Sequence, residues 1–260
     1  MSDTPDISLI LPAYNEAKTI AGTMAEATAY FGRRGLRWEL IVAADGTDGT
    51  REAARQVGAG NGRIQVIGSE LRGGKGRGIR EGVALATGKI IGFADADNKV
   101  PITEFDKVWA VVQARAGLQE GPEVVIGSRA LSDSQIERSQ PWYRKAGGKV
   151  FRAVMRTAAG LPAIGDSQCG FKFFRRDAAK ELFRRQRIDG YMFDVEILVL
   201  AARLGYRIQE VPVRWRDDRD SRLNLITGNL GNARDILRIR RMHSEVRAES
   251  TPAGSTATVR

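Results

Sequence analysis

The chain has 260 residues, 42% of them hydrophobic, a formal net charge of +10 at pH 7 and one cysteine. This is enough for one large domain or two small ones with a buried core. Nothing approaches the about 18 consecutive apolar residues of a membrane-spanning helix. The short acidic N-terminus does not look like a secretory signal, and a single cysteine excludes an internal disulfide framework. We therefore expect a soluble, cytoplasmic protein. The basic charge favours a polyanionic partner, namely nucleic acid, an anionic membrane or a phosphorylated substrate.

Short apolar runs of strand type alternate with helical patterns through the first half of the chain. The expected strands are residues 7–11, 38–44, 64–67, 89–94 and 123–127, and the expected helices are residues 16–31, 50–57, 76–86 and 103–116. This alternation favours a mostly parallel sheet with helices on both faces. Ligands of such sheets bind outside the carboxyl ends of the strands, so the loops that follow the strands are the informative ones.

The second half has a different pattern, with helices expected at residues 142–158, 177–185, 193–204 and 226–246 and strands at 169–174 and 206–215. Residues 248–260 have the small, polar composition of a disordered tail. The helix at 142–158 carries a basic stripe formed by Lys145, Lys149, Arg152 and Arg156. Two interpretations stay open: this helix lies in the interface of an anionic membrane, or it packs its apolar side on the core.

The strand at 89–94 ends in two aspartates, Asp95 and Asp97, separated by one residue. Two carboxylates so close repel, and the pKa of one of them rises unless a cation shares the site. A hard divalent ion such as Mg²⁺ or Mn²⁺ would remove that conflict and usually keeps substrate phosphates among its ligands. An isolated Asp-x-Asp also fits a strand followed by an acidic turn, so this motif does not decide by itself.

Three other loops follow strands or precede a helix. In the loop 12–16, Tyr14 could stack on a base and Glu16 could accept a hydrogen bond from a ribose or base. In the loop 45–50, Asp48 or Thr47 could cap the helix behind it, whereas Asp45 lies at the strand tip and faces the crevice. The loop 73–78 (GGKGRG) suits a phosphate because it exposes backbone N–H groups at a helix N-terminus, although it lacks the spacing of a P-loop.

Taken together, these motifs carry a resemblance. The segments 12–16 (PAYNE), 45–50 (DGTDGT), 73–76 (GGKG) and 95–97 (DAD) occur in this order at fitting spacings. As a set they resemble the family 2 glycosyltransferases, nucleotide-sugar enzymes of the GT-A fold. The segments 127–129, 166–172, 193–196 and 210–215 are similar to the dolichyl-phosphate glucosyltransferase branch and, more loosely, to the mannosyltransferases. The resemblance covers about residues 7–240.

The resemblance implies one GT-A type domain over residues 1–246, with a Rossmann-like, mostly parallel central sheet, flanking helices and a C-terminal helical region on the acceptor side. Residues 7–128 would form the nucleotide-sugar half, residues 129–246 the acceptor half, and residues 247–260 the tail. The implied activity is inverting, metal-assisted transfer of a hexose, above all glucose from UDP-glucose, to polyprenyl or dolichyl phosphate. Mg²⁺ or Mn²⁺ is the implied cofactor, and the implied place is the cytoplasmic face of an anionic membrane.

Two alternatives stay open. An enzyme of the same fold could use GDP-mannose or a soluble or glycan hydroxyl acceptor, or the chain could be a non-catalytic nucleotide or nucleic-acid binder. The sequence contains no recognised nucleic-acid-binding signature, so no nucleic acid is expected as a partner. The oligomeric state is not indicated.

Site residues follow from the resemblance and from the chemistry that the acceptor needs. The expected nucleotide-sugar contacts are Pro12, Tyr14, Glu16, Asp45, Lys75 and Asp95, and the expected metal ligands are Asp95 and Asp97. The expected catalytic residues are Asp97, Arg129 and Asp166. A polyprenyl phosphate is already largely anionic at neutral pH and needs cations rather than a base, so the expected acceptor contacts are Arg129, Arg138, Arg144 and Lys172. The resemblance also places Asp194 near the acceptor. If a base is required, Asp166 is the candidate, and its alternative role is a cap or a salt bridge to Lys172.

One departure concerns the donor. Relatives commonly carry the pattern Asp-Asp-Gly-Ser-x-Asp-Gly, whereas here Ala43 and Ala44 precede Asp45 and the loop is one residue shorter. The choice of nucleotide base therefore stays open. Two further residues have simple expectations: Cys169 as a small buried side chain, and the single histidine, His243, as a surface residue among arginines.

Overall fold

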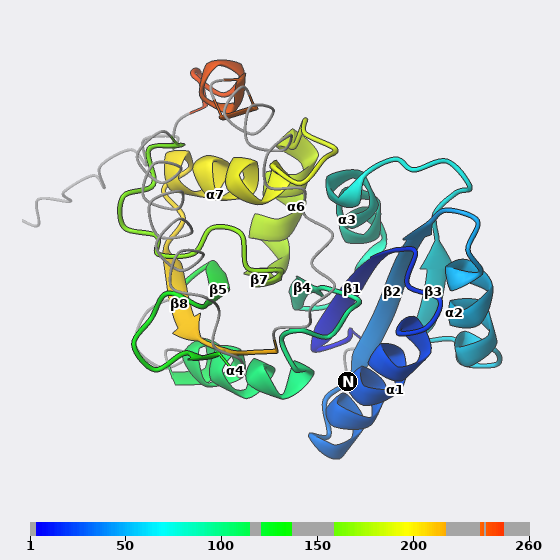
Figure 1. The fold of residues 1–260 in the computed structure, drawn as a ribbon. Coiled ribbons are helices and arrows are strands. Elements are labelled where there is room, and N and C mark those ends of the chain that lie inside the picture. Colours follow the sequence, from blue (N-terminus) through cyan, green and yellow to red (C-terminus); the bar gives the residue numbers. More distant parts are fainter. Residues whose placement is uncertain (1–3, 115–120, 137–158, 217–234, 237, 247–260) are drawn as a thin grey trace, which may run out of the picture.

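The computed structural model describes residues 4–114, 121–136, 159–216, 235–236 and 238–246. In Figure 1 a central sheet is flanked by helices. Seven strands form this sheet in the order β3-β2-β1-β4-β7-β5-β8. Their bounds are β1 Ile7–Tyr14, β2 Trp38–Asp45, β3 Ile64–Ile67, β4 Ile90–Ala94, β5 Val124–Ser128, β7 Phe171–Arg175 and β8 Ile208–Pro212. Strand β7 is antiparallel to β4 and β5, and the other pairings of this sheet are parallel, as the sequence predicts.

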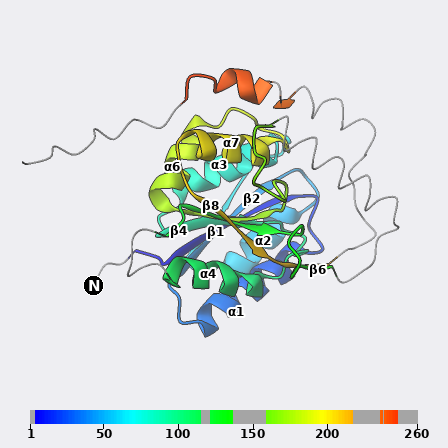
Figure 2. The same ribbon diagram turned by 90° about the vertical axis from the view of Figure 1, so that its left-hand side faces the viewer.

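Helices cover both faces of the sheet. Figure 2 shows α3, α6 and α7 over one face and α1 and α4 over the other. Residues 235, 236 and 238–242 are also helical and lie beyond α7 (Figure 2). The bounds of the helices are α1 Ile20–Arg33, α2 Thr50–Gly58, α3 Lys75–Leu85, α4 Phe105–Ala114, α6 Arg176–Arg185 and α7 Phe193–Arg203, and a short 3-10 helix, Ile102–Glu104, leads into α4.

The core is divided by the sheet because side chains of a strand alternate between its faces. In β1, Leu9 and Leu11 pack with the residues of α1 and α4, whereas Ile10 packs with those of α3, α6 and α7. All three are at most 1% exposed. Strands buried on both faces read as continuous apolar runs, which is why β1, β2 and β4 are recognisable in the sequence.

Two strands differ from the sequence prediction. Strand β1 runs through Pro12 to Tyr14, because beyond Ile10 it has no register partner in β4 and a missing N–H can be accommodated there. The strand predicted at 206–215 is two strands. The first, β8, pairs with β5 and ends at Pro212. After Val213 the chain forms β9 (Arg214–Trp215), which pairs with a short strand that the sequence did not predict, β6 (Gln135–Ile136).

The second half of the chain contributes β7 and β8 to the same sheet as the first half. The helix predicted at 142–158 and the tail 247–260 lie outside the described residues. The last predicted helix, 226–246, is described only from residue 235, and it gives way to a turn at residues 243–245 rather than continuing to 246. The division into a donor half and an acceptor half stays a prediction.

Candidate active site

The predicted site residues of the first half gather at one edge of the sheet. Strands β1, β2 and β4 are parallel and end at Tyr14, Asp45 and Ala94, so their last side chains and Asp95 emerge at the carboxyl edge. Tyr14 and Asp45 are register partners there. Half-buried Pro12 lies two residues earlier on β1. This is the edge at which open α/β sheets bind ligands.

Asp45 holds the neighbouring loop in place. Its Oδ1 accepts a hydrogen bond from the Ser69 N–H (3.1 Å), and its Oδ2 accepts one from the Gly73 N–H (2.7 Å). The same loop carries Arg72, whose guanidinium lies 4.4 Å from the centroid of the Tyr14 ring. Tyr14 is 39% exposed, so it stays partly accessible although Arg72 lies over its ring. Asp45 therefore supports the loop that covers Tyr14.

The loops after β1 and β2 are also joined to each other. The carboxylate of Asp48 accepts hydrogen bonds from the Thr50 N–H (3.1 Å) and the Ala17 N–H (3.2 Å). The N-cap of α2 is Gly49, without a side-chain cap, so Asp48 binds the first N–H group of the helix from one residue before the cap. Burial raises the pKa of Asp48, but these hydrogen bonds outweigh burial and lower it below its usual value. Glu16 donates its N–H to Thr50 Oγ1 (2.9 Å), and its carboxylate accepts from the Thr19 hydroxyl (2.7 Å).

Lys75 reaches across the crevice from the first turn of α3. Its Nζ lies 2.6 Å from Asp95 Oδ1 and 5.9 Å from the ring centroids of both Phe93 and Phe193. Burial lowers the pKa of Lys75, but the charges of Asp95 and Asp194 outweigh burial and raise it above its usual value. Lys75 of α3 is therefore protonated and places a positive charge beside the C-terminal end of β4.

The N-terminus of α3 is partly occupied by the protein itself. The carbonyl oxygen of Asp189 accepts hydrogen bonds from the N–H groups of Gly76 (2.8 Å) and Arg77 (3.3 Å). A Cβ on Gly74 would lie 2.3 Å from the same oxygen, so the glycine permits this close approach. The expectation that this terminus offers its N–H groups to a phosphate is wrong for these two groups, because a second loop already satisfies them.

The two aspartates of the Asp-Ala-Asp motif bind different lysines. Asp97 Oδ2 lies 2.9 Å from Lys99 Nζ, whereas Asp95 pairs with Lys75. Asp95 also donates its N–H to the Gly170 carbonyl (3.0 Å). The described residues contain no group of three or more acidic, histidine or cysteine side chains placed to hold a metal. Two carboxylates nevertheless fit Mg²⁺ or Mn²⁺, because such ions commonly take one or two carboxylates and complete their shell with water and substrate phosphates.

Arg129, directly after β5, is bound to Asp166. Three hydrogen bonds join them: from Nε to Oδ2 (2.6 Å), from Nη2 to Oδ1 (2.9 Å) and from the Arg129 N–H to Oδ2 (3.0 Å). Burial raises the pKa of Asp166, but the Arg129 guanidinium outweighs burial and lowers it to about 2. The alternative of a salt bridge from Asp166 to Lys172 is wrong, because Arg129 comes closer to Asp166 from the end of β5.

Lys172 instead pairs with Asp194. Its Nζ donates to Asp194 Oδ1 (2.6 Å) and to the Cys169 carbonyl (2.6 Å). Lys172 is 1% exposed and Asp194 is 4% exposed, so this pair lies beneath the surface and supports the segment that contacts Asp95. Burial raises the pKa of the Cys169 thiol to about 12, which fits its expected role as a small buried side chain. Acceptor contacts by Lys172 and Asp194 stay a prediction, and Arg138 and Arg144 lie outside the described residues.

Two residues near Arg129 were not singled out from the sequence. Glu210 of β8 accepts hydrogen bonds from the N–H groups of Gly165 (2.7 Å) and Asp166 (3.1 Å). Trp215 of β9 lies with its ring centroid 5.4 Å from the Arg129 guanidinium. Both belong to the segment 210–215 that carries part of the resemblance. Their place near Arg129 depends on the pairing of β5 with β8 and on the chain continuing from β8 into β9.

The expectation that His243 lies on the surface is wrong. His243 is 3% exposed, and its Nε2 lies 2.7 Å from Glu196 Oε1. The Glu196 carboxylate also accepts from the N–H groups of Arg187 (2.9 Å) and Ile188 (2.8 Å). Ile239, one helical turn before His243, is buried in the core beside α7, so His243 lies on the buried side of the same segment.

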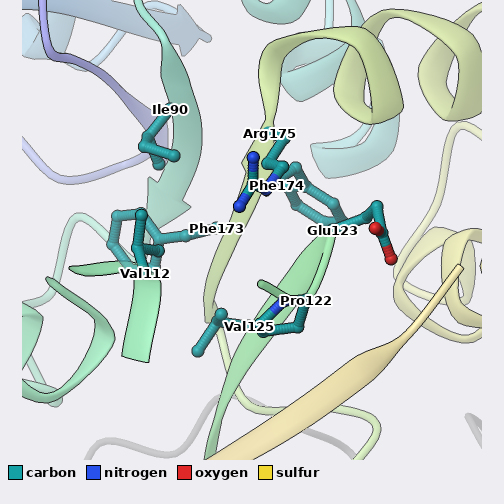
Figure 3. Close-up of a pocket in the computed structure, with 8 residues that line it drawn as sticks. All are labelled: Ile90, Val112, Pro122, Glu123, Val125, Phe173, Phe174 and Arg175. Carbon is teal, nitrogen blue, oxygen red and sulfur yellow. The ribbon is translucent and has the colours of Figure 1, made fainter. Parts of the chain in front are cut away.

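A small cleft lies at the opposite edge of the sheet. Figure 3 shows its lining, which includes Ile90 at the start of β4 and Glu123 just before β5. The remaining lining residues are Val112, Pro122, Val125, Phe173, Phe174 and Arg175. Because these parallel strands begin there, the cleft is separate from the carboxyl edge that holds Lys75 and Arg129.

Comparison with solved structures identifies the class of fold. The chain is similar to glucosyl-3-phosphoglycerate synthase from Mycobacterium tuberculosis in complex with UDP (TM-score 0.62, 22% identity, covering 96% of this chain and 83% of that one). It is also similar to mannosyl-3-phosphoglycerate synthase from Rubrobacter xylanophilus (TM-score 0.67, 17% identity, 96% and 79%). These similarities, with the sheet order and the loops at its carboxyl edge, define a GT-A type glycosyltransferase fold, as expected.

The sequence comparisons give the family. Residues 8–183 match the model of glycosyl transferase family 2, and the chain belongs to that family. It is 33% identical over 238 residues to a dolichyl-phosphate beta-glucosyltransferase of Trichomonas vaginalis, covering 89% of this chain and 70% of the relative. It is 31% identical to the proteins of the same name from Saccharomyces cerevisiae (90% and 74% covered) and Homo sapiens (92% and 76% covered).

Proposed function

We propose that this chain is an inverting hexosyltransferase that moves glucose from UDP-glucose to a polyprenyl or dolichyl phosphate. The names of the sequence relatives support the donor sugar and the acceptor. The observation that carries the choice of a phosphate acceptor is the state of Asp166, whose carboxylate is bound three times by Arg129 and whose pKa is lowered to about 2.

A hydroxyl acceptor needs a general base with a pKa near the working pH. Three carboxylates of the crevice are already in ion pairs: Asp95 with Lys75, Asp97 with Lys99 and Asp166 with Arg129. Asp45 is held by two backbone N–H groups, and Glu16 accepts from the Thr19 hydroxyl. A phosphate monoester has its second pKa near 6 and is therefore already an anionic nucleophile at neutral pH. The crevice thus suits an acceptor that brings its own charge and needs a cation to hold it.

Arg129 is the proposed holder of the acceptor phosphate. Its side chain is 26% exposed, although its partner Asp166 is 1% exposed, so part of the Arg129 side chain stays accessible from the crevice while the ion pair is buried on the Asp166 side. The Asp166 contact and the Trp215 ring fix its orientation. A planar, permanently charged donor of this kind suits phosphate recognition.

In the proposed reaction a phosphate oxygen of the acceptor attacks the anomeric carbon on the face opposite the diphosphate. The bond from that carbon to the diphosphate oxygen breaks, its electron pair stays with the nucleoside diphosphate, and the configuration at carbon inverts. No proton has to move. Lys75, at the tip of β4, would offset negative charge that grows on the leaving diphosphate.

Asp95 and Asp97 would hold a divalent ion, Mg²⁺ or Mn²⁺, together with the donor diphosphate, and the bound ion would supply further positive charge beside the leaving group. A solved neighbour was obtained in complex with Mn²⁺ and UDP, which supports this choice for the fold. For Asp97→Ala we expect loss of transfer and loss of the Mn²⁺ dependence of UDP binding, with an unchanged circular dichroism spectrum. Retention of most of the activity would contradict the metal assignment.

The nucleotide would lie over β1 and β2, against Pro12, Tyr14, Glu16 and Asp45, in the half formed by residues 7–128. The acceptor would enter through the half formed by residues 129–246. The described helices include none that is long and apolar enough to cross a membrane. We propose that the protein meets its lipid acceptor as a peripheral protein on the cytoplasmic face.

The proposal is tested by a transfer assay with the full chain and Mg²⁺ or Mn²⁺. Labelled UDP-glucose, UDP-galactose, UDP-GlcNAc and GDP-mannose are each offered with polyprenyl phosphate, with 3-phosphoglycerate and with a soluble glycan. We expect label from UDP-glucose to enter the organic phase with polyprenyl phosphate. Preferential transfer from GDP-mannose, or transfer only to phosphoglycerate or to the glycan, would overturn the proposed donor or acceptor.

A further inference from the structure

The exposed large hydrophobic side chains of the described residues are unevenly distributed. Only Leu71 (81% exposed) and Tyr191 (54% exposed) are more than half exposed in the part of the chain that the structure describes. The others, at 38 to 45%, are Tyr14, Val57, Leu85 and Ile136. Leu71 lies in the loop 68–74 before α3, and Tyr191 lies in the loop 186–192 before α7.

These two loops meet at the N-terminus of α3. The Asp189 carbonyl accepts from the Gly76 N–H (2.8 Å), and the Asp189 carboxylate lies 2.8 Å from the Arg80 guanidinium. A Cβ on Gly74 would touch the Asp189 carbonyl. Leu71 is three residues from Gly74, a span of at most about 10 Å, and Tyr191 is two residues from Asp189. We call the two loops, residues 68–74 and 186–192, the rim.

The rim borders the candidate active site. Lys75 follows the first loop directly and pairs with Asp95. Arg72, next to Leu71, covers the Tyr14 ring. The rim therefore lies beside the crevice that would hold the acceptor phosphate.

The composition of the rim matches a lipid–water interface. Tyrosine is enriched at the headgroup level of membranes, and an exposed leucine gains free energy by burial among acyl chains. Each anchor has an exposed arginine nearby, Arg72 beside Leu71 and Arg187 four residues before Tyr191. The same loops carry two exposed acids, Glu70 and Asp189, and Asp189 is paired with Arg80 of α3. Arginines at a membrane surface are attracted to anionic headgroups, and the net charge of +10 adds to that attraction.

We propose that the rim docks on an anionic membrane, with Leu71 and Tyr191 inserted at the headgroup level and Arg72 and Arg187 near lipid phosphates. The docking would place the crevice beside the bilayer that holds the acceptor. The proposal rests on the proposed function for the identity of the acceptor, whereas binding to the membrane surface can be measured without any acceptor.

The first experiment is flotation of the full chain with vesicles of phosphatidylcholine and phosphatidylglycerol that contain no polyprenyl phosphate. The variant carries Leu71→Ser and Tyr191→Ser. We expect its vesicle affinity to fall about tenfold or more, because two apolar insertions are lost. The matched control carries Val57→Ser and Leu85→Ser, two exposed side chains outside the rim, and should bind like the wild type. Equal binding by the rim variant and the wild type would overturn the proposal.

A second measurement separates docking from catalysis. With a short, water-soluble polyprenyl phosphate analogue and no vesicles, the rim variant should transfer glucose as fast as the wild type, whereas with a long-chain acceptor in vesicles it should be slower by the factor lost in binding. Equal loss with both acceptors would overturn the docking role, because the residues would then act inside the site. If vesicle binding falls as expected but neither the wild type nor the rim variant transfers glucose to either acceptor, the docking proposal is supported and the proposed function is wrong.

Discussion

Arg129 and Asp166 are joined by three hydrogen bonds, and the backbone that carries Asp166 is held in turn by Glu210. Glu210 on β8 thus holds the loop before β7, and Asp166 in that loop holds Arg129 at the end of β5. Arg129 is thus fixed by two carboxylates that do not need to touch a substrate. Fixed orientation is what a cation requires to stabilise charge at a reacting group.

Asp166→Asn should lower kcat/KM by roughly 100-fold, because the guanidinium loses its ionic partner and its fixed orientation. Most of the loss should appear in KM for the acceptor if Arg129 holds the acceptor phosphate. Steady-state kinetics with polyprenyl phosphate measure both constants. Glu210→Gln serves as the milder companion change and should reduce activity less. A wild-type KM for the acceptor in Asp166→Asn would contradict the role of Arg129.

The Asp166 pKa also predicts a pH dependence of stability. Its pKa falls from 3.8 to about 2 on folding, so the folded state favours the ionised carboxylate. The resulting contribution to the free energy of unfolding, on the order of 2 kcal/mol, is fully present above about pH 4 and is lost as the pH falls toward 2. Urea unfolding at several pH values should therefore show a steeper loss between pH 4 and 2 for the wild type than for Asp166→Asn. Parallel curves would show that the pair adds no stability.

Gly170→Ala should impair glucose transfer by displacing Asp95, the residue that follows β4. A Cβ on Gly170 would lie 2.0 Å from Asp95 Oδ2, closer than any real contact allows, so the Asp95 carboxylate that pairs with Lys75 must leave its present position. We expect a loss of transfer of at least about 100-fold. Gly22→Ala, in α1, is the control: a Cβ there meets nothing within 4 Å, and full activity is expected. Near-normal transfer by Gly170→Ala would mean that the position of Asp95 is not critical.

His243→Phe should destabilise the protein although it lies far along the chain from the motifs. The change removes the partner of the buried Glu196 carboxylate, and such a loss costs about 1–3 kcal/mol. Denaturant unfolding gives the value, and His243→Gln, which can still donate a hydrogen bond, should recover part of it. The exposed neighbour Arg241, changed to Ala, should alter stability by less than about 0.5 kcal/mol. An unchanged stability of His243→Phe would contradict the buried contact.

The parts of the fold that the sequence predicts are those fixed by local pattern. Strand β3 lies at the predicted residues, Ile64–Ile67, because an apolar run between turn residues defines it. The gathering of Tyr14, Asp45 and Asp95 at one edge also follows, since parallel strands end together. These predictions depend on periodicity and topology, which are properties of each segment and of the order of segments.

The parts that could not be predicted are contacts between distant segments. Asp166 and Glu210 are 44 residues apart, and Glu196 and His243 are 47 residues apart. Lys172 is the partner of Asp166 that the sequence suggests, because it lies only six residues away. The actual partner, Arg129, lies 37 residues away. Burial of His243 depends on the packing of Ile239 beside α7, which no local pattern encodes.

The most direct test of the phosphate acceptor compares two acceptors that differ only in the phosphate: polyprenyl phosphate and the polyprenol of the same length, each offered with labelled UDP-glucose and Mg²⁺ or Mn²⁺. We predict label in the polyprenyl phosphate product and none above background with the polyprenol, because Asp95, Asp97 and Asp166 are paired with Lys75, Lys99 and Arg129 and are therefore poor bases for a hydroxyl acceptor. Comparable transfer to the polyprenol would contradict the proposed phosphate acceptor.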